Sequence, residues 1–81
     1  MALDTLQSRE RLVTLLERYG PLLTDHQRQV MDLHVRQDWS LSEVAHQQDI
    51  SRAAVHDLVR RATQALEDFE QRLGLIAERD R

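Results

Sequence analysis

The chain has 81 residues, of which 41% are hydrophobic and 4% aromatic, with no cysteine and a formal net charge of −3. A chain of this length forms one domain with one small core, which argues against an enclosed substrate cavity and against most enzymes that act alone. The lack of cysteine excludes disulfides, thiolate zinc sites and a cysteine nucleophile. The negative charge also speaks against a strongly basic nucleic-acid-binding domain, whose pI typically exceeds about 9. With two glycines, one proline and 31% charged residues, the composition indicates an all-α fold.

The first expected helix runs from about Asp4 to Tyr19. Asp4 with Gln7 three residues later fits a capping box, and Gly20-Pro21 is a stop signal. One broad face carries the apolar residues Leu6, Leu12, Val13, Leu16 and Tyr19. We therefore expect residues 1–20 to form a packing helix that covers the rest of the domain.

Two further capping boxes predict the next two helices. Thr24 with Gln27 opens a helix to about Gln37, and Ser40-Leu41-Ser42-Glu43 opens a helix of two turns that ends near Gln48. The inner positions of the two helices are Val30, Met31, Leu33 and either His34 or Val35, followed by Leu41, Val44 and Ala45. Asp38-Trp39 separates the two helices, and Trp39 either packs on the helix that it introduces or is an exposed contact residue.

The last expected helix is long, from Arg52 to a C-terminal cap at Gly74, after a turn over Asp49-Ile50-Ser51. Its apolar residues alternate at spacings of four and three and form a heptad seam: Val55, Val59, Ala62, Leu66, Phe69 and Leu73. A trihelical core of residues 24–65 covers only the first half of this seam. The extension over residues 66–76 needs another cover, either the first helix or a second subunit. We expect a symmetric homodimer that uses Leu66, Phe69, Leu73 and Ile76.

Residues 40–65 have the pattern of a helix-turn-helix. A capped two-turn helix is followed by a three-residue turn with Ile50 in its middle, and by a second helix that opens with Ser51-Arg52. Contacts to base edges or phosphates would come from the start of that second helix, at Ser51, Arg52, Ala53, His56, Asp57, Arg60, Arg61 and Gln64. The alternative is that the arginines only form ion pairs with acidic residues three or four positions away.

No catalytic, metal or cofactor site is expected. The four histidines, at 26, 34, 46 and 56, never fall at an i, i+4 spacing. Ser40 and Ser51 occupy cap positions, and no histidine with an acidic partner is placed to activate a serine. No apolar run reaches the ~18 residues that cross a bilayer, and the first residues lack a basic segment followed by an apolar one. We expect a soluble cytoplasmic protein that is not an enzyme and does not insert into membranes.

Several of these motifs together resemble the YlxM family, small bacterial proteins whose helix-turn-helix is similar to region 4 of sigma factors. They are Leu22-Leu23-Thr24, Gln27-Arg28, residues 40–45, Ser51-Arg52, Ala54-Val55, Asp57, Arg60-Arg61 and the stretch from Leu66-Glu67 to Leu73. The resemblance covers about residues 16–76. The acidic run Glu67-Asp68-Phe69-Glu70 favours this family over a sigma factor, whose last helix turns basic there.

The resemblance implies a sigma region 4-like or winged-helix-like bundle with a long C-terminal helix. It also implies a cytoplasmic DNA-binding regulator that takes part in the signal recognition particle pathway. The alternative is a protein-interaction module that binds the protein or RNA of that particle without recognising specific DNA. Family members commonly have glutamine where Ala53 stands and tyrosine where His56 stands, so two groups on the expected contact surface differ here.

Overall fold

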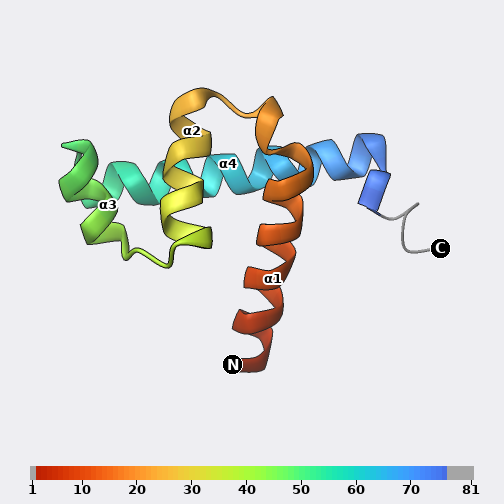
Figure 1. Ribbon diagram of the computed structural model, residues 1–81, viewed down its shortest axis with the longest axis horizontal. Helices are drawn as coiled ribbons and strands as arrows, with labels where there is room; N and C mark the ends of the chain where they lie inside the picture. The colour runs from red at the N-terminus through yellow and green to blue at the C-terminus, as the bar shows by residue number, and fades with distance from the viewer. Residues whose placement is uncertain (1, 77–81) are drawn as a thin grey trace.

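The computed structural model describes residues 2–76, and residues 2–7 as backbone only. Over this range the chain is helical, without a strand and therefore without the β-wing of a winged helix. The elements are α1 (Ala2–Tyr19), the 3-10 turn η1 (Gly20–Leu22), α2 (Asp25–Met31), the π-helix η2 (Asp32–Arg36), α3 (Leu41–Gln48) and α4 (Arg52–Leu73). Figure 1 shows α4 running along the longest dimension of the molecule, with α3 near its N-terminal end and α1 crossing it at a steep angle. The predicted all-α fold is confirmed.

Local hydrogen bonds explain where most of the helices begin. The Thr24 hydroxyl accepts the N–H of Gln27 at 3.1 Å, and the Ser40 hydroxyl accepts the N–H of Glu43 at the same distance. The Gln27 and Glu43 side chains accept the N–H groups of their cap residues in return, so both capping boxes are confirmed. Ser51 caps α4 by accepting the N–H of Ala54 at 3.0 Å.

The start of α1 differs from the prediction. α1 begins at Ala2, so Asp4 lies inside the first turn and is not the N-cap. Ala2 and Leu3 are strong helix formers, which favours a start of the helix before Asp4. The side chain of Leu6, expected on the apolar face, lies outside the described residues.

The second predicted helix consists of two parts, because α2 passes into the π-helix η2. The N–H of Gln37 donates to the carbonyl of Asp32 at 3.0 Å, a bond that spans five residues. Leu33 and Val35 are both buried, whereas His34 is half-buried with its Nδ1 hydrogen-bonded to the Trp39 carbonyl at 2.7 Å. Val35, and not His34, is thus the inner residue of the two that the sequence left open.

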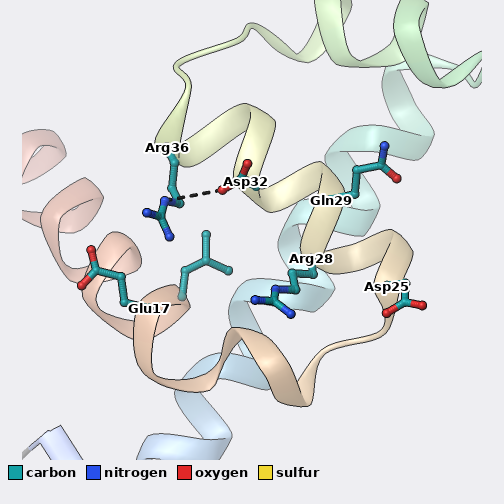
Figure 2. Close-up of a pocket in the computed structure, with 7 residues that line it drawn as sticks. Glu17, Asp25, Arg28, Gln29, Asp32 and Arg36 are labelled. Carbon is teal, nitrogen blue, oxygen red and sulfur yellow. Dashed lines mark ion pairs between the residues drawn. The ribbon is translucent and has the colours of Figure 1, made fainter.

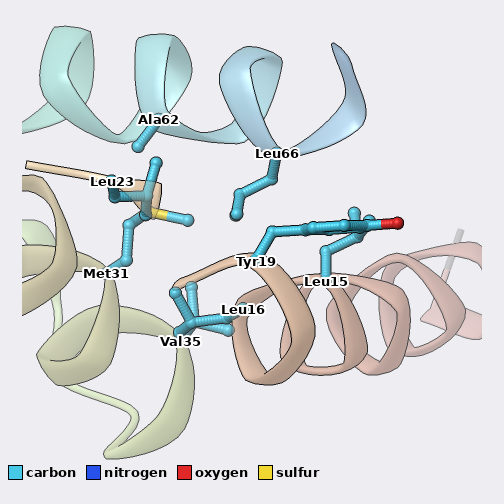
Figure 3. Close-up of a cluster of buried hydrophobic side chains, with 8 residues drawn as sticks. All are labelled: Leu15, Leu16, Tyr19, Leu23, Met31, Val35, Ala62 and Leu66. Atoms are coloured by element: carbon cyan, nitrogen blue, oxygen red, sulfur yellow. The ribbon is translucent and has the colours of Figure 1, made fainter. Parts of the chain in front are cut away.

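Two clusters of buried side chains hold the helices together. One lies between α1, α2 and the second half of α4, and Figure 3 shows its members: Leu15, Leu16, Tyr19, Leu23, Met31, Val35, Ala62 and Leu66. The other joins α2 and η2 to α3 and the start of α4, through Val30, Leu33, Val44, Ala45 and Val55. Trp39 is half-buried against the second cluster, so it packs on the core at the entrance to α3. Because α4 contributes to both clusters, its position is fixed along most of its length.

The second half of the α4 seam is covered within the chain. Leu66 is completely buried, and the ring of Phe69, which is half-buried, lies 6.1 Å from the ring of Tyr19 in α1. Arg11 of α1 adds a two-pronged ion pair with Glu67 at 2.8 and 2.9 Å. The sequence left open whether the first helix or a second subunit covers the second half of the seam. In the structure the first helix, α1, covers it. Ile76 also packs on this cluster, whereas Leu73 remains 50% exposed. The homodimer stays a prediction.

Candidate nucleic-acid interface

The helix-turn-helix is built from α3, a tight turn and α4. Asp49 ends α3 in the left-handed conformation at φ 57°, which aspartate tolerates better than most residues. The N–H of Ile50 donates to the carbonyl of Ala45 at 3.1 Å, and the Ile50 side chain packs on the cluster beneath the turn. Because Ser51 caps α4 directly after this turn, the relative position of the two helices is fixed by packing and by local hydrogen bonds.

The eight residues predicted for nucleic-acid contact lie together in the structure. All belong to α4 or to its N-cap, and from Arg52 to Gln64 they recur at helical spacing on the side that faces away from Val55 and Ala62. Seven are exposed and Asp57 is half-buried. We call this surface the reading face: Ser51, Arg52, Ala53, His56, Asp57, Arg60, Arg61 and Gln64. These residues lie together as the helical spacing predicts, and their contact with nucleic acid stays a prediction.

Asp57 is the electrostatic centre of the reading face. Its Oδ1 accepts a hydrogen bond from Arg60 Nη2 at 2.9 Å, and its Oδ2 lies 2.9 Å from Arg61 Nε. The Arg60 hydrogen bond, together with the positive charges of both arginines, holds the pKa of Asp57 below its ordinary value. The carboxylate is therefore ionised at neutral pH. For Arg60 and Arg61 the predicted ion pairs within the helix are confirmed.

Arg52 is in a different state from the other two arginines. It lies in the first turn of α4, is exposed, and forms no ion pair with the described side chains, those of residues 8–76. Gln64, at the far end of the reading face, donates to Asp68 Oδ1 at 3.0 Å. Arg52 is thus the cation that a nucleic acid could approach without breaking an existing interaction.

One contact that positions the helix-turn-helix has no signal in the sequence. Arg9 of α1 donates to the carbonyl of Val35 at 3.3 Å and forms an ion pair with Asp38 at 3.0 Å. Asp38 has a positive φ of 65° and lies in the segment that leads into α3. Arg9 therefore ties α1 to the entrance of the helix-turn-helix. Its two partners lie more than 25 positions away in the sequence, which is beyond the reach of local patterns.

A groove of 410 Å³ lies between α1 and the segment formed by α2 and η2 (Figure 2). Its lining carries charges of both signs, and Arg36 and Asp32 form an ion pair there at 3.4 Å. The lining residues are Leu16, Glu17, Asp25, Arg28, Gln29, Asp32 and Arg36. No residue of the reading face takes part in it. Among the side chains that the structure describes, those of residues 8–76, no group of three or more histidine or acidic residues is arranged to hold a metal ion. No helix of the described chain is long and apolar enough to cross a membrane.

Comparison with known proteins agrees with this architecture. Residues 6–81 match the UPF0122 family, which is described as "Putative helix-turn-helix protein, YlxM / p13 like". A UPF0122 protein of Symbiobacterium thermophilum is 44% identical over 72 residues, which are 89% of this chain and 67% of the relative. A UPF0122 protein of Clostridium kluyveri is 43% identical over 74 residues, 91% of this chain and 67% of the relative. For a third, from a Thermoanaerobacter species, the identity is 43% over 65 residues, which are 80% of this chain and 56% of the relative.

Proposed function

The chain belongs to the UPF0122 family of YlxM / p13-like helix-turn-helix proteins, and on this premise we propose that it binds double-stranded DNA through the reading face of α4. The observation that carries this proposal is the exposed cation Arg52 in the first turn of a helix whose opposite side is packed on the core through Val55, Ala62 and Leu66. In helix-turn-helix proteins the second helix enters the major groove with its N-terminal residues against the base edges. Regulation of transcription and a role in the signal recognition particle pathway extend this proposal, as the resemblance implies.

Each part of the reading face has a separate role in this proposal. Arg52, at the N-terminal end of α4, reaches a guanine edge on the floor of the major groove or a phosphate at its rim. Arg60 and Arg61, two turns further along, reach the phosphates that flank the groove. The small side chain of Ala53 lets the first turn approach the bases closely. Because the chain carries a net charge of −3, binding rests on these few local cations.

We propose that the DNA-binding form is a homodimer. A dimer presents two reading faces to two half-sites, as operator-binding proteins of this class do. Leu22, Leu73 and Leu75 are 56%, 50% and 36% exposed and are the large apolar side chains that remain open to solvent in the described chain. Leu73 and Leu75 lie at the C-terminal end of α4, at the opposite end of the helix from Arg52.

The test is a titration of fluorescent duplex DNA at several salt concentrations with the intact chain. We expect Arg52→Ala to weaken binding by about 1–3 kcal/mol if Arg52 reads a base with two hydrogen bonds. If Arg52 contacts a phosphate, the slope of log affinity against log salt should fall by about 0.9. Arg18→Ala removes an exposed arginine of α1 outside the reading face and serves as the matched control.

Two results would reject the proposal. One is the absence of duplex binding at low salt, and the other is equal binding by the wild type and an Arg52→Ala, Arg60→Ala double variant. Binding to the RNA or protein of the signal recognition particle, in place of DNA, would favour the interaction module that the resemblance leaves as the alternative.

A further inference from the structure

Asp57 forms ion pairs with both Arg60 and Arg61, the two arginines of the reading face that lie two turns beyond Arg52. One carboxylate oxygen is engaged by Arg60 and the other by Arg61, each at 2.9 Å. The two arginine side chains remain 65% and 70% exposed, so a phosphate could reach them from solvent. A phosphate that does so must compete with a carboxylate that is already in place.

The ion pairs of Asp57 with Arg60 and Arg61 are expected to contribute little to the stability of the fold. Ion pairs between exposed residues three or four positions apart on a helix contribute little to folding, because water screens them and side-chain entropy opposes them. α4 is already held by Val55, Ala62 and Leu66, which are completely buried. The effect of Asp57 is therefore expected on binding more than on folding.

We infer that Asp57 limits the affinity of the reading face for DNA that offers only phosphates. This inference rests on the proposed function. Non-specific binding draws on phosphate contacts, and its salt dependence counts the phosphates that are neutralised. With Asp57 present, Arg60 and Arg61 must exchange one anion for another, and the freed carboxylate then lies close to the DNA backbone. Each of these costs falls on every DNA sequence.

A lower affinity for phosphates alone raises the discrimination between DNA sequences when the target sequence offers a favourable contact to Asp57. A base that presents an amino group in the major groove, as cytosine does with N4, can donate to a carboxylate, whereas a phosphate cannot. DNA sequences without a hydrogen-bond donor opposite Asp57 leave its carboxylate without compensation and are bound less tightly. The unfavourable contact thus selects against them. Because any specific site competes with a large excess of non-specific DNA, a lower non-specific affinity has a direct effect on occupancy.

The experiment compares the wild type with Asp57→Asn on a duplex of mixed sequence. Removing the carboxylate frees Arg60 and Arg61 for two phosphates, so the slope of log affinity against log salt should steepen by about 1–2, at about 0.9 for each phosphate. At about 50 mM salt the affinity should rise about tenfold. Asp57→Glu retains the charge and should bind as the wild type does.

Asp68→Asn is the matched control for net charge. Asp68 lies on the same helix, is also half-buried, and is hydrogen-bonded to Gln64 rather than to an arginine. It lies 11 residues from Asp57, about 16 Å along the helix at 1.5 Å per residue. If Asp68→Asn raises the affinity as much as Asp57→Asn does, the effect is one of general charge and the inference is wrong. Asp57→Ser provides a second variant, and circular dichroism checks that each variant folds.

The outcomes separate this inference from the function on which it rests. If neither the wild type nor Asp57→Asn binds duplex DNA at low salt, the proposed function fails. If both bind with equal affinity and equal salt slope, while Arg60→Ala and Arg61→Ala weaken both, DNA binding stands and the role of Asp57 is rejected. A stronger and steeper binding curve for Asp57→Asn, lost again when Arg60 and Arg61 are also replaced, supports the inference.

Discussion

The Tyr19 hydroxyl joins the end of α1 to the end of α4. It donates to Glu70 Oε1 at 2.5 Å and accepts the backbone N–H of Leu75 at 3.2 Å. Burial raises the pKa of Tyr19, and the hydrogen bond to Glu70 raises it further. Tyr19 is the single tyrosine, and the chain has neither lysine nor cysteine. It is therefore the one side chain that titrates in the alkaline range below arginine.

We expect the protein to lose stability when Tyr19 ionises. Because the pKa is raised in the folded state, the stabilisation is complete below the unfolded value of about 10 and is lost as the pH rises through the folded pKa. Tyr19→Phe should be less stable at neutral pH, since the Leu75 N–H and Glu70 lose a partner, but should lack this alkaline decrease. Urea unfolding of both proteins from neutral pH to about 11 measures the difference. A parallel decrease in the two proteins would contradict the assignment.

The capping box of α3 gives a second prediction for single residues. The backbone N–H and the hydroxyl of Ser40 both bond with Glu43 and hold the pKa of its carboxyl below the ordinary value. A lowered pKa means that the stabilisation is present above the unfolded pKa and is lost as the pH falls through the folded one. We expect Ser40→Ala to destabilise the fold by about 1 kcal/mol and to raise the pKa of Glu43. Chemical denaturation and a carboxyl titration by NMR check the two effects, and a Glu43 pKa that does not change in Ser40→Ala would contradict them.

These residues also show which interactions can be predicted from the sequence and which cannot. Capping boxes join residues three positions apart, so the pairs Thr24 with Gln27 and Ser40 with Glu43 are readable from the sequence. The bonds from Tyr19 to Glu70 and from Arg9 to Val35 join residues 51 and 26 positions apart. Only the packing of α1 across α4 brings these groups together, and no local pattern specifies it.

Among the elements, α1 is the one whose packing partner could not be predicted from the sequence. The heptad spacing defines which side of α4 is apolar but not what covers it, because a helix of the same chain and a helix of a partner bury the same residues. Tyr19 and Leu15, both completely buried or nearly so, show that α1 provides this cover. The grouping of the reading-face residues on one side needs only the N-cap and the helical spacing of one element, whereas their contact with nucleic acid stays a prediction.

The cover by α1 predicts a gradient of stability along the seam. Leu66 is completely buried, so Leu66→Ala should destabilise the fold by about 2–5 kcal/mol. Leu73 on the same seam is 50% exposed, and Leu73→Ala should cost about 1 kcal/mol or less in the isolated chain. Denaturant unfolding at a protein concentration too low for association makes the comparison. Similar costs for the two variants would mean that α1 does not cover Leu66 in solution.

At the scale of the whole molecule, the two ends of α4 present different surfaces. The helix has 22 residues, which is about 33 Å at 1.5 Å per residue. The reading face runs from its N-cap to Gln64, and two exposed leucines, Leu73 and Leu75, lie at its last residue and beyond it. An interface at the C-terminal end therefore leaves both reading faces of a symmetric dimer accessible, far enough apart to reach separate half-sites.

This arrangement decides which substitution can test the dimer. Phe69 packs on Tyr19, so Phe69→Glu would bury a charge against the core of one subunit and unfold it. Leu73 is half exposed, and Leu73→Glu leaves that core intact. We expect the wild type to sediment as a dimer at micromolar concentration, and Leu73→Glu to sediment as a monomer with unchanged helix content and weaker DNA binding. Gln71→Glu adds the same charge at an exposed neighbouring position and serves as the matched control. A monomeric wild type, or a Leu73→Glu variant that stays dimeric, would contradict an interface at this end of α4.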